Sequence, residues 1–245
     1  MSYALILHGW PQYRVDRYFL SNHLRKNGYK ILTPNMFSRG YIFSPANVLN
    51  EVLIKLNNNE LDLIIGISLG GLILPHIARH FPNSKLIFIG TGPKLESKSR
   101  NFNLMVKVAK TFLSFGFLSL LLKLPDSVIR YFYKVANPFT GDLSRKQKYD
   151  IDTCKNIKFI KSISLNEEKE ILNFVTEVDN SNILGKLNNK SLIFNGENDL
   201  LMTTKGGKKL HRLLKNSKFV ISKGSHFDSF TRENLDEVDK FIASI

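Results

Sequence analysis

Residues 61–71 read LDLIIGISLGG, a short apolar run followed by a serine set between glycines. The pattern Gly66-x-Ser68-x-Gly70 is typical of a sharp turn between a buried strand and a helix. Small residues are needed two positions either side of the serine, because a Cβ atom there would clash with the strand or the helix. The turn holds the Ser68 hydroxyl out at the carboxyl end of the sheet, beside helix N–H groups that stabilise developing negative charge. The segment therefore predicts a nucleophilic serine.

Three other segments combine a buried strand with polar residues directly after it. The runs 4–7, 191–194 and 218–221 lead into His8-Gly9-Trp10-Pro11, Asn195-Gly196-Glu197-Asn198-Asp199 and Lys223-Gly224-Ser225-His226-Phe227. The carboxyl ends of parallel strands form the edge at which open sheets bind their ligands. We therefore expect the residues after these strands to share one site with Ser68.

The order Ser68, Asp199, His226 along the chain, with the motifs quoted above, resembles the α/β-hydrolase family. The resemblance covers about residues 1–92 and 190–245. It implies an α/β fold, with a mostly parallel sheet of about six strands flanked by helices. Because the His8-Gly9 strand comes first, the two strands that usually precede it in the family are missing.

Hydrophobic periodicity predicts the same fold class. Strands are expected at residues 4–8, 30–33, 63–67, 85–90, 191–195 and 218–222. Helical spacing of apolar residues occurs at 17–27, 46–56, 69–81, 203–214 and 234–245. Near-continuous apolar strands joined by helical crossovers are typical of a parallel sheet covered on both faces.

Residues 93–189 interrupt this alternation. They contain helical stretches at 102–124, 125–135, 144–150 and 166–178, and no convincing strand pattern. The resemblance implies that 93–189 is a helical cap or lid inserted between two parts of the core, 1–92 and 190–245. Such caps close active sites and shape the pocket for the acyl or alcohol group.

The most apolar run of the cap, residues 111–122, has three interpretations. Its helix packs on the core, lines a pocket for an acyl chain, or touches a membrane interface. The run is shorter than the ~20 apolar residues that span a bilayer, so no transmembrane segment is expected. The residues that we expect to bind substrate are Phe112, Phe115, Phe117, Tyr131, Phe132 and Met36.

Each expected catalytic role follows from the demands of ester hydrolysis. Ser68 is a weak nucleophile and needs a base to remove its proton, for which His226 is the candidate. Asp199 would accept a hydrogen bond from the other imidazole nitrogen and fix the tautomer. The resemblance implies an oxyanion hole made by the backbone N–H groups of Leu69 and Trp10.

Several neighbouring residues compete for these roles. Glu197 is the alternative acid, but the family pattern places the acid at the later position, Asp199. His8 is expected to be structural rather than a base. His76 and His80 are four apart on one helix without a carboxylate in a metal signature, so neither a metal site nor a cofactor is expected.

Composition limits the partners and the compartment. The 245-residue chain carries a formal net charge of +14, but no nucleic-acid-binding motif accompanies it, so nucleic acid is not an expected partner. A solvated basic surface, or weak attraction for an anionic carrier or a membrane surface, accounts for the charge. Cys154 is the single cysteine and excludes an internal disulfide. The chain shows no signal segment, so a cytoplasmic location is expected.

The sequence therefore predicts a serine hydrolase, with two function classes left open. The first is a carboxylic-ester hydrolase acting on small-molecule esters of short to medium acyl chain, with thioesters or amides as neighbouring substrates of the same machinery. The second is a weakly catalytic ligand-binding protein that keeps the same scaffold. Serine at the nucleophile position argues against the dehalogenase and epoxide-hydrolase branches, which use aspartate there.

Overall fold

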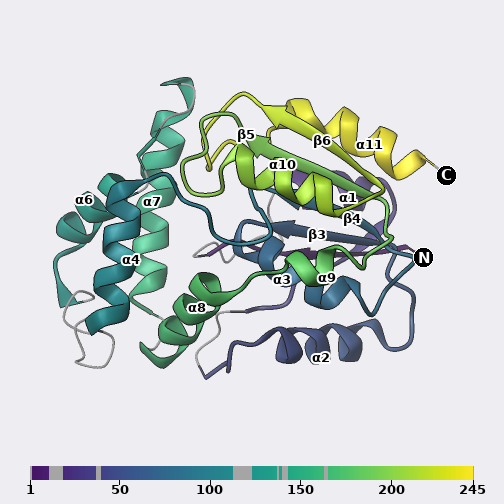
Figure 1. The fold of residues 1–245 in the computed structure, drawn as a ribbon, viewed down its shortest axis with the longest axis horizontal. Helices are drawn as coiled ribbons and strands as arrows, with labels where there is room; N and C mark the ends of the chain where they lie inside the picture. Colours follow the sequence, from purple (N-terminus) through teal and green to yellow (C-terminus); the bar gives the residue numbers. More distant parts are fainter. Residues whose placement is uncertain are drawn as a thin grey trace.

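The computed structural model describes residues 2–10, 19–36, 40–112, 123–136, 138–139, 143–162 and 165–244. Its centre is a six-stranded sheet in the order β2-β1-β3-β4-β5-β6, in which every neighbouring pair is parallel (Figure 1). The strands are β1 (Ser2–Leu7), β2 (Tyr29–Leu32), β3 (Leu63–Ile67), β4 (Lys85–Ile89), β5 (Ser191–Gly196) and β6 (Ser217–Ser222). All six predicted strands are confirmed, with ends that differ by at most two residues.

Apolar side chains on both faces of the strands explain why the sheet is buried between two layers of helices. Alternate residues of a strand point to opposite faces. Leu5 and Leu7 of β1 belong to one core cluster, whereas Ala4 and Ile6 belong to a second cluster. All four side chains are fully buried. The near-continuous apolar pattern of the sequence therefore results from burial on both sides.

Helices from both ends of the chain cover the two faces (Figure 1). The helices of this core are α1 (Phe19–Lys26), α2 (Pro45–Leu56), α3 (Leu69–Ala78), α10 (Thr204–Leu213), η4 (Arg232–Asn234) and α11 (Leu235–Ala243). Helices α1 and α11 contribute Leu20 and Val238 to the cluster around Ile6. Helices α2, α3 and α10 contribute buried residues to the cluster around Leu5.

The described residues between β4 and β5 form helices, and Glu96 of this segment makes an isolated β-bridge with Met202, which follows β5. These helices are α4 (Arg100–Phe112), α6 (Asp126–Ala136), η3 (Leu143–Arg145), α7 (Lys146–Ile160), α8 (Leu165–Glu177) and α9 (Ser181–Leu184). Helices α4, α6 and α7 gather at the side of the sheet toward which the strand arrows point (Figure 1). These three helices therefore lie beyond the carboxyl ends of the strands, whereas α8 and α9 contribute Ile171 and Leu184 to the core cluster around Leu5.

The strand order reverses between β1 and β3. From β1 the chain first crosses to β2 at one edge, and then returns to build β3 to β6 on the other side of β1. In open parallel sheets, the loops that leave the carboxyl ends at such a reversal diverge and open a crevice for ligands. The loop after β3 begins with Ser68, so the fold places the predicted nucleophile at this position.

Candidate active site

Ser68 occupies a strained turn between β3 and α3. Its φ of 52° and ψ of −111° are rarely adopted by residues with a side chain. A Cβ atom on Gly66 would lie 2.7 Å from the carbonyl oxygen of Gly70, and one on Gly70 would overlap the carbonyl of Leu7. The steric reason for the Gly66-x-Ser68-x-Gly70 pattern is therefore confirmed.

The end of β1 lies directly against this turn. The absent Cβ of Gly70 is what lets the Leu7 and His8 carbonyls approach the first turn of α3. Leu69 is the first residue of α3, where backbone N–H groups have no acceptor within the helix. His8 is buried and its Nδ1 donates to the Gly9 carbonyl at 3.1 Å, while the Trp10 side chain is 37% exposed.

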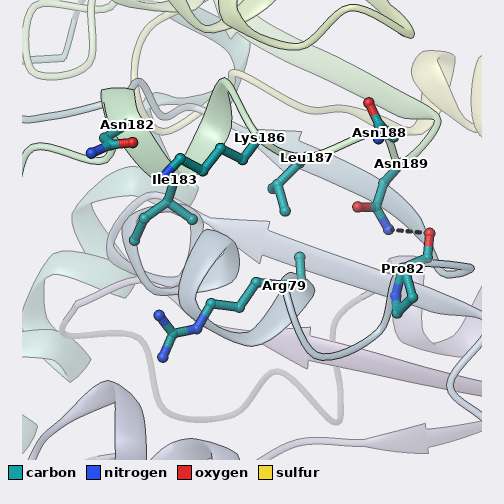
Figure 2. A pocket seen from close by; sticks show the side chains of 9 residues that line it. Arg79, Pro82, Asn182, Ile183, Lys186, Leu187, Asn188 and Asn189 are labelled. Atoms are coloured by element: carbon teal, nitrogen blue, oxygen red, sulfur yellow. Dashed lines mark hydrogen bonds between the residues drawn. The ribbon is translucent and has the colours of Figure 1, made fainter.

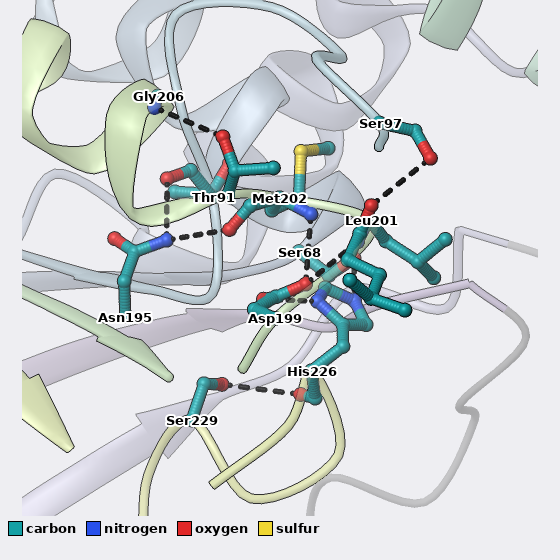
Figure 3. A network of polar contacts seen from close by, with 12 residues as sticks. Ser68, Thr91, Ser97, Asn195, Asp199, Leu201, Met202, Gly206, His226 and Ser229 are labelled. Carbon is teal, nitrogen blue, oxygen red and sulfur yellow. Dashed lines mark hydrogen bonds and ion pairs between the residues drawn. The ribbon is translucent and has the colours of Figure 1, made fainter. Parts of the chain in front are cut away.

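A hydrogen-bonded chain joins the three predicted residues (Figure 3). Ser68 Oγ lies 2.9 Å from Nε2 of His226, and Nδ1 of His226 lies 2.7 Å from Oδ2 of Asp199. The carboxylate can only accept, so Nδ1 carries the proton when the imidazole is neutral, and Nε2 is left to accept from the serine hydroxyl. This is the geometry that proton removal from a serine requires.

Asp199, and not Glu197, is the carboxylate that contacts the imidazole. Asp199 is 3% exposed, whereas Glu197 is exposed on the turn after β5. The second oxygen of Asp199, Oδ1, accepts backbone N–H groups from Leu201 and Met202, each at 2.8 Å. These bonds stabilise a buried charge and fix the direction in which the carboxylate points.

The charge of Asp199 determines the proton affinity of His226. Burial lowers the pKa of His226, but the attraction of the Asp199 charge and its hydrogen bond raise it, and the balance leaves the pKa above its ordinary value. The protonated imidazole is therefore stabilised where it is placed. A group in this position can take a proton from Ser68 and hold it.

Two features at the carboxyl ends of β4 and β5 were not expected from the sequence. Gly90 follows β4 with a φ of 55°, and a Cβ there would lie 2.6 Å from Ser229 Oγ and 3.5 Å from Cε1 of His226. Asn195, at the end of β5, donates from Nδ2 to the carbonyls of Thr91 and Met202 (Figure 3). In the sequence, the approach of Gly90 to His226 is indicated only by the presence of a glycine at the end of an apolar strand. The hydrogen bonds of the Asn195 side-chain amide are not indicated by any short sequence pattern.

The residues expected to bind substrate lie in different surroundings. Met36 is buried in the core cluster around Leu5. Tyr131 and Phe132 on α6 are 66% and 50% exposed, with ring centroids 5.9 Å apart. Phe115, Phe117 and the side chain of Phe112 lie outside the described residues.

A surface cavity of about 320 Å³ lies elsewhere (Figure 2). It is lined by residues that include Arg79, Lys186 and Asn189. Pro82 and Asn189 of its wall precede β4 and β5, so the cavity lies at the amino ends of the strands, away from Ser68.

Within the described ranges, no group of three His, Cys, Asp or Glu side chains could hold a metal ion. In that same part of the chain, no helix is long and apolar enough to cross a membrane.

Comparison with protein families gives one match that spans most of the chain. The sequence model of a family described as alpha/beta hydrolase fold matches residues 5–233. No curated protein sequence matches the chain.

Solved structures of similar fold include enzymes with several names. A bromoperoxidase from Bacillus anthracis has a TM-score of 0.74 at 17% identity, covering 99% of this chain and 92% of its own. An enol-lactonase from Burkholderia xenovorans has a TM-score of 0.73 at 14% identity, covering 100% and 92%. An esterase from Rhodococcus has a TM-score of 0.72 at 18% identity, covering 99% and 90%. At these identities the likeness shows a shared fold.

Proposed function

We propose that this chain, which belongs to the α/β hydrolase fold family, is a serine hydrolase that cleaves small carboxylic esters of short to medium acyl chain. The observation that supports the proposal most is the hydrogen-bonded series from Ser68 through His226 to Asp199. The strained backbone of Ser68 adds support, because strain of this kind persists where it serves a site. An enol-lactonase and an esterase among the similar folds also act on ester bonds by name.

The proposed reaction has two half-reactions. His226 Nε2 takes the proton of Ser68 as Oγ bonds to the acyl carbon, and the carbonyl oxygen becomes an oxyanion. The oxyanion collapses, the bond to the leaving oxygen breaks, and His226 returns the proton to the departing alcohol. Water then attacks the acyl-enzyme with His226 as base again, which releases the acid and restores Ser68. Asp199 stabilises the imidazolium in both half-reactions.

We assign the oxyanion contacts to the backbone N–H groups of Leu69 and Trp10. Leu69 supplies an N–H without a helical acceptor next to Ser68. Trp10 follows the His8-Gly9 segment, which leaves β1 where that strand lies against α3. We further propose that residues 93–189 act as the cap over this site, since helices α4, α6 and α7 lie beyond the strand ends (Figure 1).

A panel of nitrophenyl esters with acyl chains of graded length tests the proposed function, with a matching thioester and amide alongside. We expect ester hydrolysis that is fastest for short or medium chains, and covalent labelling of Ser68 by a fluorophosphonate. Each buried methylene contributes about 0.8 kcal/mol, so KM should fall with chain length until the pocket is filled. Binding of esters without turnover or labelling would instead favour a ligand-binding protein.

The activity should depend on pH through His226. Only the neutral imidazole can accept the serine proton, so kcat/KM should fall as the pH is lowered through its pKa. Because Asp199 raises this pKa, the midpoint of the fall should lie above the ordinary histidine value of about 6.5. A pH profile of kcat/KM between pH 5 and 9 measures it. A profile that stays flat across this range would contradict the role of His226 as base.

A further inference from the structure

The ring of Tyr149, on α7, contacts the residue that follows His226. Tyr149 is 4% exposed and packs edge-to-face on Phe227, with ring centroids 5.7 Å apart and an interplanar angle of 88°. Lys148 places its ammonium 5.9 Å from the centroid of the same Phe227 ring. The buried Tyr149 ring meets the half-buried Phe227 ring in a defined orientation, so it restricts where Phe227 can lie.

The next residue along this loop, Asp228, contacts the same helical segment through charge. Nη1 of Arg145, at the end of η3, lies 3.6 Å from Oδ1 of Asp228, whose side chain is largely buried. Asp228 also closes the turn that contains His226, because its N–H donates to the Ser225 carbonyl at 3.1 Å. A cation beside a buried carboxylate offsets the cost of its desolvation, so the loop and η3 are stabilised together.

These two contacts flank His226 on its C-terminal side and come from a segment about eighty residues earlier in the chain. Gly90, which follows β4, also lies close to the imidazole, because a Cβ on Gly90 would lie 3.5 Å from Cε1 of His226 and 2.6 Å from Oγ of Ser229. The imidazole must keep Ser68 and Asp199 within hydrogen-bond distance at the same time. Its position therefore depends on the residues that hold its loop in place. A shift of the loop would break one of the two bonds.

We propose that Tyr149 and Arg145 are positioning residues, through which the helical segment 143–160 holds the loop of His226 in the geometry that joins Ser68 to Asp199. The inference rests on the proposed function. It implies that the helical segment contributes to the chemical step as well as covering the site. A displacement of η3 and α7 from the core would release His226 from its partners and lower the rate of serine attack.

Tyr149→Leu tests the aromatic contact, and Tyr149→Phe is the conservative control because it keeps the ring. We expect the leucine variant to lower kcat for nitrophenyl acetate about tenfold with KM within about twofold, and the phenylalanine variant to stay near the parent. The rate of fluorophosphonate labelling at Ser68 should fall with kcat. A change in KM alone would show that Tyr149 shapes the substrate pocket, and unchanged kinetics would also overturn the proposal.

Titration of the His226 ring by NMR gives a readout that is independent of activity. Burial raises the pKa of Tyr149 to about 12, so Tyr149→Leu removes no charge at neutral pH. If the loop moves His226 away from Asp199, the pKa of His226 should fall toward its ordinary value in the leucine variant alone. An unchanged His226 pKa would overturn the positioning role. If the parent protein shows neither hydrolysis nor labelling, the proposed function is overturned, but the NMR titration of His226 still tests the positioning role.

Arg145→Gln provides a second variant should Tyr149→Leu fail to fold. The Arg145 side chain is about one third exposed, so its replacement disturbs less packing. We expect a lower kcat with little change in KM, because Asp228 loses the cation beside it. Lys146→Ala, an exposed lysine one residue further along, is the matched control and should leave kcat unchanged. Equal kinetics for the Arg145→Gln and Lys146→Ala variants would overturn the role of Arg145.

Discussion

Ser68→Ala is expected to lower kcat for ester hydrolysis on the order of 10⁶-fold while the protein remains folded. Without Oγ no acyl-enzyme can form, and loss of the nucleophile in a comparable site has an effect of this size. Alanine keeps a Cβ, so the strained backbone at φ 52° meets the same steric conditions as in the parent. The measurement is kcat on nitrophenyl acetate, with circular dichroism and a thermal melt to compare the fold.

The same variant should lose all fluorophosphonate labelling, which is a more specific test of Ser68 than the rate of hydrolysis. A residual rate in the Ser68→Ala protein could come from a contaminating esterase, whereas a labelled peptide identifies the reacting side chain directly. Labelling at another serine, or activity within about tenfold of the parent, would contradict the assignment of Ser68 as nucleophile.

Asp199→Asn is expected to lower kcat about 10⁴-fold, as in a comparable triad. The amide of asparagine can present N–H toward Nδ1 of His226, which favours the tautomer with the proton on Nε2. The proton then lies on the nitrogen that faces Ser68 at 2.9 Å, so the imidazole cannot accept from the hydroxyl. The variant should also shift the pH midpoint of kcat/KM downward, because the charge of Asp199 is what raises the pKa of His226.

Glu197→Gln is the matched control, two residues earlier on the same turn. Glu197 is exposed, and its Oε1 accepts a hydrogen bond from Nδ2 of the neighbouring Asn198 at 3.5 Å. We expect kcat within about twofold of the parent for this variant, because solvent screens the charge of an exposed carboxylate from the residues of the site. A larger loss for Glu197→Gln than for Asp199→Asn would transfer the acid role to Glu197.

The turn at Ser68 was predictable because its causes lie within a few residues. Gly66 and Gly70 are required by atoms of the neighbouring turn and of β1, and an apolar run followed by Gly-x-Ser-x-Gly indicates that turn directly. The six strands were predictable for a similar reason, since burial on both faces leaves continuous apolar runs in the sequence. The carboxyl ends of parallel strands then bring Asp199 and His226 to the same edge as Ser68.

The orientation of the side chains at that edge required the tertiary structure. Asp199 and Glu197 lie on one turn, and their types alone do not say which carboxylate points to the imidazole. The N–H groups of Leu201 and Met202 fix that direction for Asp199. Gly90 could be recognised as the end of a strand, but its approach to His226 depends on how the loop after β6 folds back.

The sequence by itself thus determined the sheet, the strained turn with Ser68, and the sheet edge at which His226 and the carboxylates after β5 join it, because steric limits and the periodicity of burial can be recognised from neighbouring residues. Only the tertiary structure decided that Tyr149 and Arg145 contact the loop of His226. Contacts between segments about eighty residues apart depend on how whole helices pack. That packing follows from the fit of many side chains at once, and no short pattern in the sequence specifies it.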